Sequence, residues 1–410
     1  MADTKTCCLV VENLPVPLDG RVWQEAKTLR DAGWTVHVIC PATEQFPNFY
    51  EELEGIRIHR HKLPLEGEGL GGFILEYGAA IFHEIRLLAK IWRQGQIDVI
   101  QVCNPPDILF LSVLPFKLLG ARMVYDLHDL CPELFYVKFG KRGLLYRAMR
   151  LFERLTIAIA DHVVTANQTF ADMIRRRDRV PAFKVTTMYR FPLPSFFARR
   201  GAVESREPGE KLVVGYMGVM NAQDGVENFL EAVAQLKLSD PALDFTARLV
   251  GDGPSRPELE KLARDLDIAD RTEFLGYVSG DAFTDALGSF DIGVIPDPVN
   301  EFNDTISMIK VFEYMALGIP MVSFRLAETV RLAGDTLTLA ADDTAAALGD
   351  AVGILVHDPV LRAEKAQASR ERALSKFVWE RQAAKYVGVF EGLLPPPERI
   401  GEAVGSTDFS

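Results

Sequence analysis

The sequence predicts two doubly wound α/β domains of the Rossmann-like type that face each other across an interdomain cleft. The length of 410 residues suits two or three domains. Short β-branched runs alternate with longer helical patterns in both halves, and a polar segment without periodicity interrupts the alternation near residue 200. The composition, 48% hydrophobic and 25% charged, is that of a folded globular protein.

In the first half, helical patterns such as Val22–Ala32 and Gly72–Trp92 separate six expected strands. These strands are Cys7–Val11, Thr35–Cys40, Ile56–His59, Val99–Val102, Met123–Tyr125 and Val163–Ala166. Strands that alternate with helices form β-α-β units and therefore a parallel sheet.

The polar run Ala198–Glu210 is interpreted as an interdomain linker, because it contains Gly and Pro and has no apolar periodicity. Six further strands are expected after it: Val213–Tyr216, Phe245–Val250, Thr272–Leu275, Ile292–Ile295, Met321–Phe324 and Leu337–Leu339. We therefore predict domains over residues 1–200 and 201–380. Residues 381–410 are expected to form a helix that returns towards the first domain, followed by a flexible tail.

The charge is unevenly distributed along the chain. The net charge of −12 argues against a general nucleic-acid binder, which needs a basic surface. Residues 138–200, however, hold 14 basic and 4 acidic side chains. In this region Lys138, Lys141, Arg142, Arg147, Arg150 and Arg154 interleave with Phe139, Leu144, Leu145, Met149 and Phe152. A basic amphipathic helix of this kind favours binding to a membrane surface, and the alternative is a solvated helix face.

Cysteine usage and the N-terminus predict a cytoplasmic protein. The five cysteines form no C-x-x-C pair, which favours buried free thiols in a reducing compartment. The sequence shows no pattern of a signal peptide and no run of 18 apolar residues. The basic region would allow peripheral attachment to the cytoplasmic face of a membrane.

The segment Gly67–Gly72 matches the dinucleotide pattern G-x-G-x-x-G, but we reject that interpretation. It follows the third expected strand rather than the first, and no acidic residue ends a strand about 20 residues later. A flexible loop is favoured, with a mobile lip over a substrate as the alternative.

Ligands of open parallel sheets bind outside the carboxyl ends of the strands, so the loops there hold the candidate site residues. In Pro17–Arg21, Asp19 is suited to cap a helix and Gly20 allows close backbone approach. Arg21 would then stand at a helix N-terminus, where phosphate binds. The alternative is a capped turn with a solvated arginine.

Three more strand exits carry candidates. His128, flanked by Asp126 and Asp129, follows the fifth strand, and the alternative is a surface histidine at a helix start. Gly218, in the loop Gly215–Gly225, would let the backbone approach a ligand. The glycine-rich exit after Leu249 is interpreted mainly as a turn.

The segment Asn303–Pro320 is the most informative. We expect a helix with Ser307 as its N-cap and with Lys310 and Glu313 on one face, since they are three residues apart. A lysine at a helix N-terminus suits a diphosphate, and a glutamate one turn later suits the vicinal hydroxyls of a ribose. An ordinary i,i+3 salt bridge is the alternative.

Lys310–Pro320 resembles the signature of family 4 glycosyltransferases. Further segments that look like this family are Asp19–Val22, Tyr125–Asp129, Gly215–Gly225, Val250–Pro254 and Phe274–Val278. The resemblance implies the GT-B fold, an acceptor side in the first domain and a nucleotide-sugar site in the second. It also implies retaining transfer of a sugar from a nucleotide diphosphate donor, with a UDP-sugar favoured and GDP- or other sugars open.

The resemblance also implies roles for individual residues. Lys310 would bind the diphosphate, Glu313 the ribose hydroxyls, and His128 the donor sugar or the diphosphate. The donor site would also include Gly20, Arg21, Arg190, Gly218, Tyr277, Asp304 and Ser307. Neither a cofactor nor a metal is expected, because basic residues can replace Mg²⁺.

The sequence departs from the family at three positions. Thr305 stands where a glutamate is common, and Asp304 is the candidate substitute. Val219 and Asp224 stand where an arginine and a lysine often hold the diphosphate. These departures keep two alternatives open, a non-catalytic nucleotide-sugar-binding or scaffold subunit and a sugar-nucleotide epimerase. The expected partners are the donor and a glycan, lipid-linked or small-molecule acceptor, with no nucleic acid.

Overall fold

The computed structural model describes residues 5–62, 69–192, 194–198 and 211–395. Almost all of the expected linker and the tail beyond residue 395 therefore lie outside the described residues. The same is true of the first two positions of Gly67–Gly72, whereas its last four residues open a helix and are not a loop.

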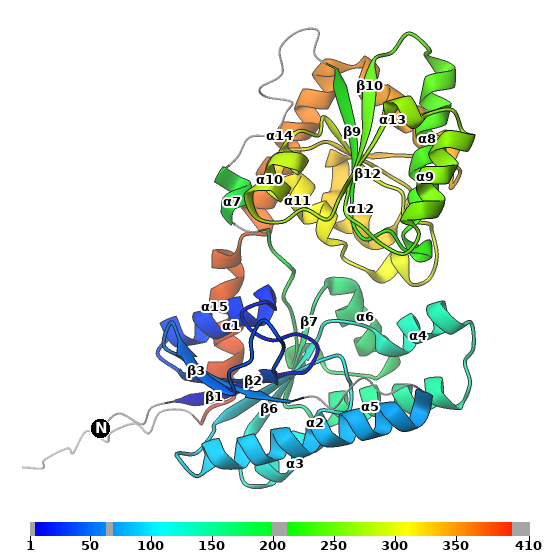
Figure 1. The fold of residues 1–410 in the computed structure, drawn as a ribbon. Helices are drawn as coiled ribbons and strands as arrows, with labels where there is room; N and C mark the ends of the chain where they lie inside the picture. Colours follow the sequence, from blue (N-terminus) through cyan, green and yellow to red (C-terminus); the bar gives the residue numbers. More distant parts are fainter. Residues whose placement is uncertain (1–4, 63–68, 193, 199–210, 396–410) are drawn as a thin grey trace, which may run out of the picture. The chain divides into compact units, whose positions relative to one another are not determined.

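The first half of the chain forms an eight-stranded sheet in the order β3-β4-β2-β1-β5-β6-β7-β8 (Figure 1). Its strands are β1 (Thr6–Val11), β2 (Thr35–Pro41), β3 (Tyr50–Leu53), β4 (Ile56–His61), β5 (Val99–Cys103), β6 (Arg122–Leu127), β7 (His162–Thr165) and β8 (Val185–Thr187). Strand β3 pairs antiparallel with β4, whereas β4, β2, β1, β5 and β6 pair in parallel. All six expected strands are confirmed, and β3 and β8 are additional.

Helices connect these strands. They are α1 (Gly20–Asp31), α2 (Gly69–Trp92), α3 (Phe110–Leu118), α4 (Cys131–Phe139), α5 (Leu144–Ile159) and α6 (Gln168–Arg177). Helix α1 begins where the sequence predicts, because the Asp19 carboxylate accepts the backbone N–H groups of Arg21 and Val22 at 3.2 and 3.1 Å. Its apolar side, including Val22 and Leu29, is buried.

The second half forms a six-stranded parallel sheet in the order β11-β10-β9-β12-β13-β14. Its strands are β9 (Leu212–Met217), β10 (Phe245–Val250), β11 (Thr272–Gly276), β12 (Ile292–Ile295), β13 (Met321–Ser323) and β14 (Leu337–Leu339). All six expected strands are confirmed. The first strand, β9, lies between β10 and β12, so the strand order reverses at the β9–β12 edge. Such a reversal is where ligands bind in this class of sheet.

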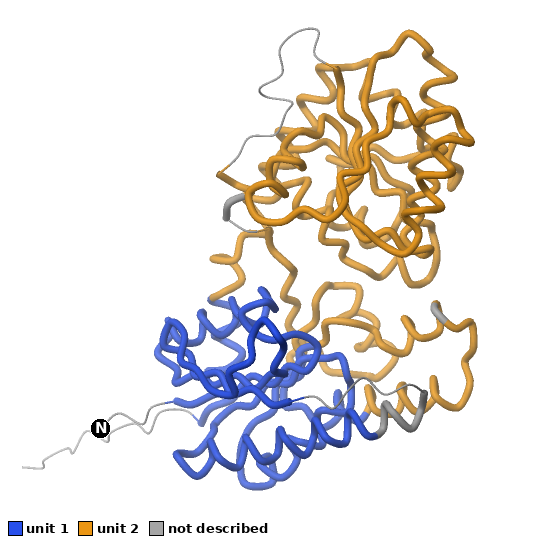
Figure 2. Tube along the Cα trace, viewed as in Figure 1, with its two compact units in different colours: residues 1–126, 155–163, 384–410 blue, residues 127–154, 164–383 orange. Residues whose placement is uncertain are grey.

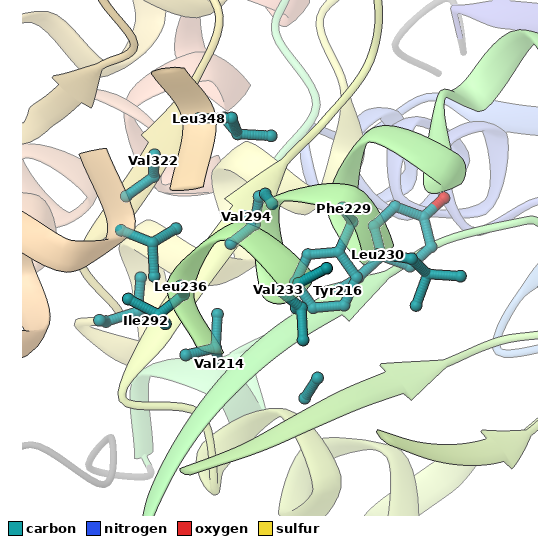
Figure 3. Packing of buried hydrophobic residues seen from close by; sticks show 14 of the residues in the cluster. Val214, Tyr216, Phe229, Leu230, Val233, Leu236, Ile292, Val294, Val322 and Leu348 are labelled. Carbon is teal, nitrogen blue, oxygen red and sulfur yellow. The ribbon is translucent and has the colours of Figure 1, made fainter. Parts of the chain in front are cut away.

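Two hydrophobic cores cover the two faces of this sheet. The helices are α7 (Pro194–Ala198), α8 (Val226–Ser239), α9 (Arg256–Asp265), α10 (Gly280–Gly288), α11 (Ile309–Leu317), α12 (Ala327–Ala333), α13 (Ala345–His357) and α14 (Pro359–Lys376). Val214 and Tyr216 of β9 belong to one core with Phe229 of α8 and Leu348 of α13 (Figure 3). Their alternating neighbours Val213 and Met217 belong to the core around α11 on the opposite face. Side chains that alternate in this way mark a strand buried on both faces.

The chain divides into two compact units (Figure 2): residues 1–126, 155–163 and 384–410, and residues 127–154 and 164–383. Within the first unit, helix α15 (Trp379–Gly392) contacts the first sheet, because the Tyr386 hydroxyl donates to Gln101 Oε1 at 2.7 Å. The Phe390 ring packs edge-on against Trp34. The three-part division with boundaries after residues 200 and 380 stays a prediction.

Candidate active site

Helix α11 carries the Lys310–Glu313 pair that the sequence analysis selected. The helix spans Ile309–Leu317 and ends at Gly318, whose left-handed backbone places its N–H on the last carbonyls. Its buried apolar residues include Val311, Phe312, Tyr314 and Met315. Burial of this face fixes the rotation of the helix and directs Lys310 towards the β9–β12 edge.

The segment before α11 is tied to helix α12. The N-cap residue is Met308, so the predicted cap at Ser307 is wrong: its hydroxyl instead donates to Glu328 Oε1 at 3.1 Å. Asp304 Oδ1 accepts the N–H of Ala327, the first residue of α12, at 2.8 Å. Asp304 and Ser307 therefore hold the entrance to α11 in place, and their contacts with a donor stay predictions.

Lys310 lies in a buried polar pocket. Its Nζ contacts Asp297 Oδ2 at 2.8 Å and lies 4.7 Å from the centre of the Tyr216 ring. The lysine side chain is 9% exposed, so its ammonium is held by a carboxylate and an aromatic face. Neither partner was predicted. The available signal was an acidic residue just after a buried strand, since Asp297 lies two positions beyond the end of β12.

Asp297 is buried, and burial raises its pKa. Lys310 opposes this effect, and Asp224 adds to it. The Lys310–Asp297 pair thus carries no net charge when both groups are ionised. The positive charge at this edge is consequently offset before any anion binds.

The glycine loops after β9 and β10 pack backbone against backbone. A Cβ on Gly218 would lie 2.7 Å from the Tyr216 hydroxyl and 3.7 Å from Lys310 Cε. A Cβ on Gly251, whose φ is +132°, would lie 1.9 Å from the Gly218 carbonyl oxygen. The Gly251 N–H also donates to the Gly276 carbonyl at 2.9 Å. This hydrogen bond and the close approach of Gly251 to Gly218 hold the ends of β9, β10 and β11 together near Lys310. A side chain at either glycine would clash, so both positions require glycine.

Glu313 sits one turn after Lys310 with one oxygen, Oε2, enclosed and without a hydrogen-bond partner. Burial raises the pKa of Glu313 to about 8, and the positive charge of Arg190 opposes the rise. At neutral pH the side chain is therefore mostly a neutral carboxylic acid, which can donate one hydrogen bond as well as accept. Arg190 lies near enough to Glu313 to act on it electrostatically, and the contacts of both residues with a donor stay predictions.

The other predicted positions of the second unit differ in their surroundings. Tyr277 follows β11 and is 81% exposed, so its ring is accessible. At the positions where the family often has basic residues, Val219 is exposed and the Asp224 carboxylate accepts the Asn221 N–H at 3.0 Å. Asp224 therefore stabilises a turn and adds negative charge.

In the first unit, Gly20 begins α1, and nothing lies within 4 Å of the position that its Cβ would take. Arg21 departs from the prediction. Its guanidinium is buried and contacts Asp126 Oδ1 at 2.7 Å and Glu25 Oε1 at 3.1 Å. It is therefore not a solvated cation at the helix N-terminus, because it forms ion pairs with two buried carboxylates. Burial lowers the pKa of Arg21, but Asp126 and Glu25 outweigh this effect and raise it.

His128 follows β6 and is half-buried. One ligand-type atom of His128 lies within 4.8 Å of counterparts on Cys103 and Asp126. Asp126 itself binds Arg21. The contact of His128 with a donor stays a prediction.

Both halves of the chain resemble known glycosyltransferases. Residues 21–191 match the family described as Glycosyltransferase Family 4, and residues 211–358 match Glycosyl transferases group 1. The α-D-kanosaminyltransferase of Streptomyces kanamyceticus is 24% identical over 82% of this chain and 89% of its own length. The 2-deoxystreptamine glucosyltransferase of the same organism is 27% identical over 91% of this chain and 98% of its own.

Solved structures agree in fold. The sucrose-phosphate synthase of Thermosynechococcus elongatus superposes with a TM-score of 0.72 at 17% identity, covering 95% of this chain and 99% of that chain. The Anabaena protein HepE in complex with UDP and glucose gives a TM-score of 0.65 at 17% identity, covering 95% and 99%. These similarities and the two parallel sheets define a glycosyltransferase of the GT-B fold.

The chain belongs to glycosyltransferase family 4. It is an enzyme of the hexosyltransferase type. No helix in the described part of the chain has both the length and the apolarity needed to cross a bilayer.

Proposed function

We propose that this enzyme transfers a hexosyl group from a nucleotide diphosphate sugar to an acceptor hydroxyl with retention of the anomeric configuration. A UDP-sugar is the favoured donor. The reaction would serve the assembly of a glycan, polysaccharide or glycolipid. No cofactor or metal is required in this proposal. Nucleotide diphosphates and sugar hydroxyls are chemically matched by the lysine, the glycine loop and the glutamate described above.

One observation carries the proposal: Lys310 lies directly beneath the Gly218 loop at the switch point of the second sheet, with Glu313 one turn away. A diphosphate at this edge would meet the Lys310 ammonium and the backbone of the loop. The ribose hydroxyls would reach Glu313. Negative charge that develops on the leaving diphosphate would be stabilised by these groups, which is the main electrostatic task of such a transfer.

The acidic partner of Lys310 shapes how it would act. Asp297 holds the ammonium in a fixed position, so little reorganisation is needed when the diphosphate arrives. The donor must then compete with Asp297 for Lys310. Asp297 can respond by taking up a proton, since burial already raises its pKa.

Donor turnover tests the proposal. Purified enzyme is incubated with UDP-glucose or GDP-mannose, with and without candidate acceptors, and nucleotide release is measured. The product anomer is then assigned by proton NMR. Lys310→Met should lower release about 10²–10³-fold, whereas Lys261→Met, on the exposed side of α9, should leave it unchanged. No nucleotide release with any donor would favour a non-catalytic binding subunit. Conversion of the donor to another nucleotide sugar without acceptor would favour an epimerase.

We also propose that the region 138–200 binds an anionic membrane surface from the cytoplasmic side. In the structure, Phe139 is 61% and Leu144 85% exposed at the junction of α4 and α5. Arg147 and Arg154 of α5 are also exposed. Apolar side chains beside free cations suit the headgroup region of a bilayer. Arg150 and Arg177 contribute less, because both form ion pairs with the buried Glu153.

Vesicle sedimentation tests this second proposal. The enzyme should sediment with vesicles that contain phosphatidylglycerol and remain in solution with pure phosphatidylcholine. The double variant Phe139→Ser/Leu144→Ser should lose the interaction. Leu118→Ser, at an equally exposed leucine (82%) at the end of α3, is the control. Equal sedimentation of the native protein with both vesicle types would contradict the electrostatic part of the proposal.

A further inference from the structure

A second polar cluster lies in the first unit, formed by the carboxylates of Glu12 and Glu84 and the imidazole of His61. Glu12 follows β1, His61 ends β4, and Glu84 belongs to α2. Their relative exposures are 6%, 3% and 0% for Glu12, His61 and Glu84. One ligand-type atom of each lies within 4.8 Å of the other two. Three separate elements therefore direct titratable groups into one enclosed point.

The cluster lacks compensating charge. Among the residues that the structure describes, the His61 Nε2–Glu12 Oε2 contact at 3.0 Å is the one contact of the cluster that could pair opposite charges. Among the described residues, Glu12 Oε1, His61 Nδ1 and both oxygens of Glu84 are enclosed without a hydrogen-bond partner of good geometry. Ser112 and Glu12 lie close enough to Glu84 to hydrogen-bond with its carboxyl group, while the Ser112 hydroxyl also donates to the Leu109 carbonyl at 2.7 Å. Buried polar atoms rarely stay unpaired, so four in one place require an explanation.

A shared proton explains only part of this arrangement. One proton between the two carboxyl groups would satisfy one donor oxygen and one acceptor oxygen. It would leave His61 Nδ1 without a partner among the described residues, and it would leave one net negative charge on the two buried carboxyl groups. A divalent cation would instead engage several of these atoms and would neutralise both carboxylates.

We propose that Glu12, His61 and Glu84 bind one divalent transition-metal ion, with Zn²⁺ as the best chemical fit. Zn²⁺ takes imidazole nitrogen at about 2.0–2.1 Å and carboxylate oxygen at about 2.0–2.2 Å. Tetrahedral bonds of this length place ligand atoms roughly 3.4 Å apart, which rotamer-scale movement can reach from the observed spacing. A water molecule would complete the shell. The ion would join the ends of β1 and β4 to α2, which makes it a structural site.

Cys103, Asp126 and His128 form another group of three possible ligands. This group has less need of a bound cation. Asp126 already contacts Arg21 at 2.7 Å, so its charge is compensated. The rest of the Glu12 cluster is also well ordered for binding, because the His83 ring stacks on His61 with their centres 5.6 Å apart. This stacking restricts the orientation of the His61 ring.

Zinc titration of the full chain tests the proposal. The protein is treated with a chelator, transferred to chelator-free buffer and titrated with ZnCl₂ by calorimetry. We expect one tight site per chain and a higher melting temperature with Zn²⁺. Glu84→Gln should weaken this site at least about 100-fold, since loss of a mere outer-shell partner costs 10–100-fold. Glu76→Gln, two turns earlier on α2, should bind as the native protein does. Without Zn²⁺, Glu84→Gln should be as stable as the native protein or more stable, because it removes an uncompensated buried acid.

X-ray absorption of the zinc-loaded protein identifies the ligands. The proposed site gives nitrogen and oxygen neighbours alone, whereas a site at Cys103 adds sulfur at about 2.3 Å. Sulfur in the spectrum, no tight Zn²⁺ binding by the native chain, or native affinity in Glu84→Gln would each overturn the proposal. If Glu84→Gln fails to fold, Glu12→Gln takes its place with the same expected loss.

Discussion

Replacing Lys310 by methionine tests both the stability and the function that the structure assigns to this residue. The substitution keeps most of the side-chain volume but removes the charge that contacts Asp297 at 2.8 Å. Both side chains are under 10% exposed, and removing one partner of a buried pair typically costs about 3–5 kcal/mol. Because burial raises the pKa of Asp297, the carboxyl group can take up a proton, so we expect the lower end of this range.

The double variant Asp297→Asn/Lys310→Met separates the two roles. It removes both charges, and a buried pair replaced by neutral groups is often neutral in stability. We expect urea unfolding to show that the double variant recovers most of the loss. Nucleotide release from UDP-glucose should stay about 10²–10³-fold low in both variants, since the contact with the diphosphate is missing in each.

Two results would refute this reasoning. If Lys310→Met keeps native nucleotide release, Lys310 does not stabilise the leaving diphosphate. If the double variant is no more stable than Lys310→Met, an unpaired Asp297 charge is not the cause of the stability loss in Lys310→Met. The proposed zinc site does not affect either outcome, because its residues lie in the other unit.

Further predictions concern three single residues. Glu313 has a pKa of about 8, so UDP-sugar affinity measured by calorimetry should rise with pH up to about 8; in Glu313→Gln it should be flat. The same raised pKa predicts that Glu313 stabilises the native protein below pH 4.5 and that this contribution is lost as pH rises through 8, by up to about 1.4 kcal/mol per unit. Gly251→Ala places a Cβ 1.9 Å from a backbone oxygen and should cost at least about 2 kcal/mol by urea unfolding, whereas Gly288→Ala, with open space around its Cβ, should be near neutral. Arg21→Met leaves Asp126 and a second carboxylate buried without a cation and should destabilise by about 3–5 kcal/mol without donor; a change below 0.5 kcal/mol would contradict the buried ion cluster.

The parallel strands were predictable because they are buried on both faces and read as continuous apolar runs. Strand β3 was missed because Tyr50–Leu53 carries two adjacent glutamates and is an exposed edge strand. Its apolar pattern is therefore weak, and its strand conformation depends on pairing with β4. Strand β8 has three residues, too few for a periodicity to appear.

Within the site, local spacing was informative and long-range partners were not. Lys310 and Glu313 share a helix face whatever surrounds them, so the sequence sufficed. Asp297 and Tyr216 reach Lys310 only through the order of the strands, which the sequence did not specify. The same limit explains Arg21, because its partner Asp126 lies 105 positions away in the chain.

The charge balance around Lys310 bears on how a dianionic diphosphate would be held. The second unit offers one buried lysine there, and it is already paired with Asp297. Asp224, at a position where the family often has a lysine, adds a further negative charge and raises the pKa of Asp297. Binding energy must then come largely from other groups, such as Arg190 near Glu313, because the N–H groups of Gly218 and Met220 in this loop already donate to the carbonyls of Val250 and Asp252 at 3.0 Å. The position of this loop depends on the close backbone packing that Gly251 makes possible, so this glycine, which has no side chain to touch a ligand, is expected to matter for donor binding as well.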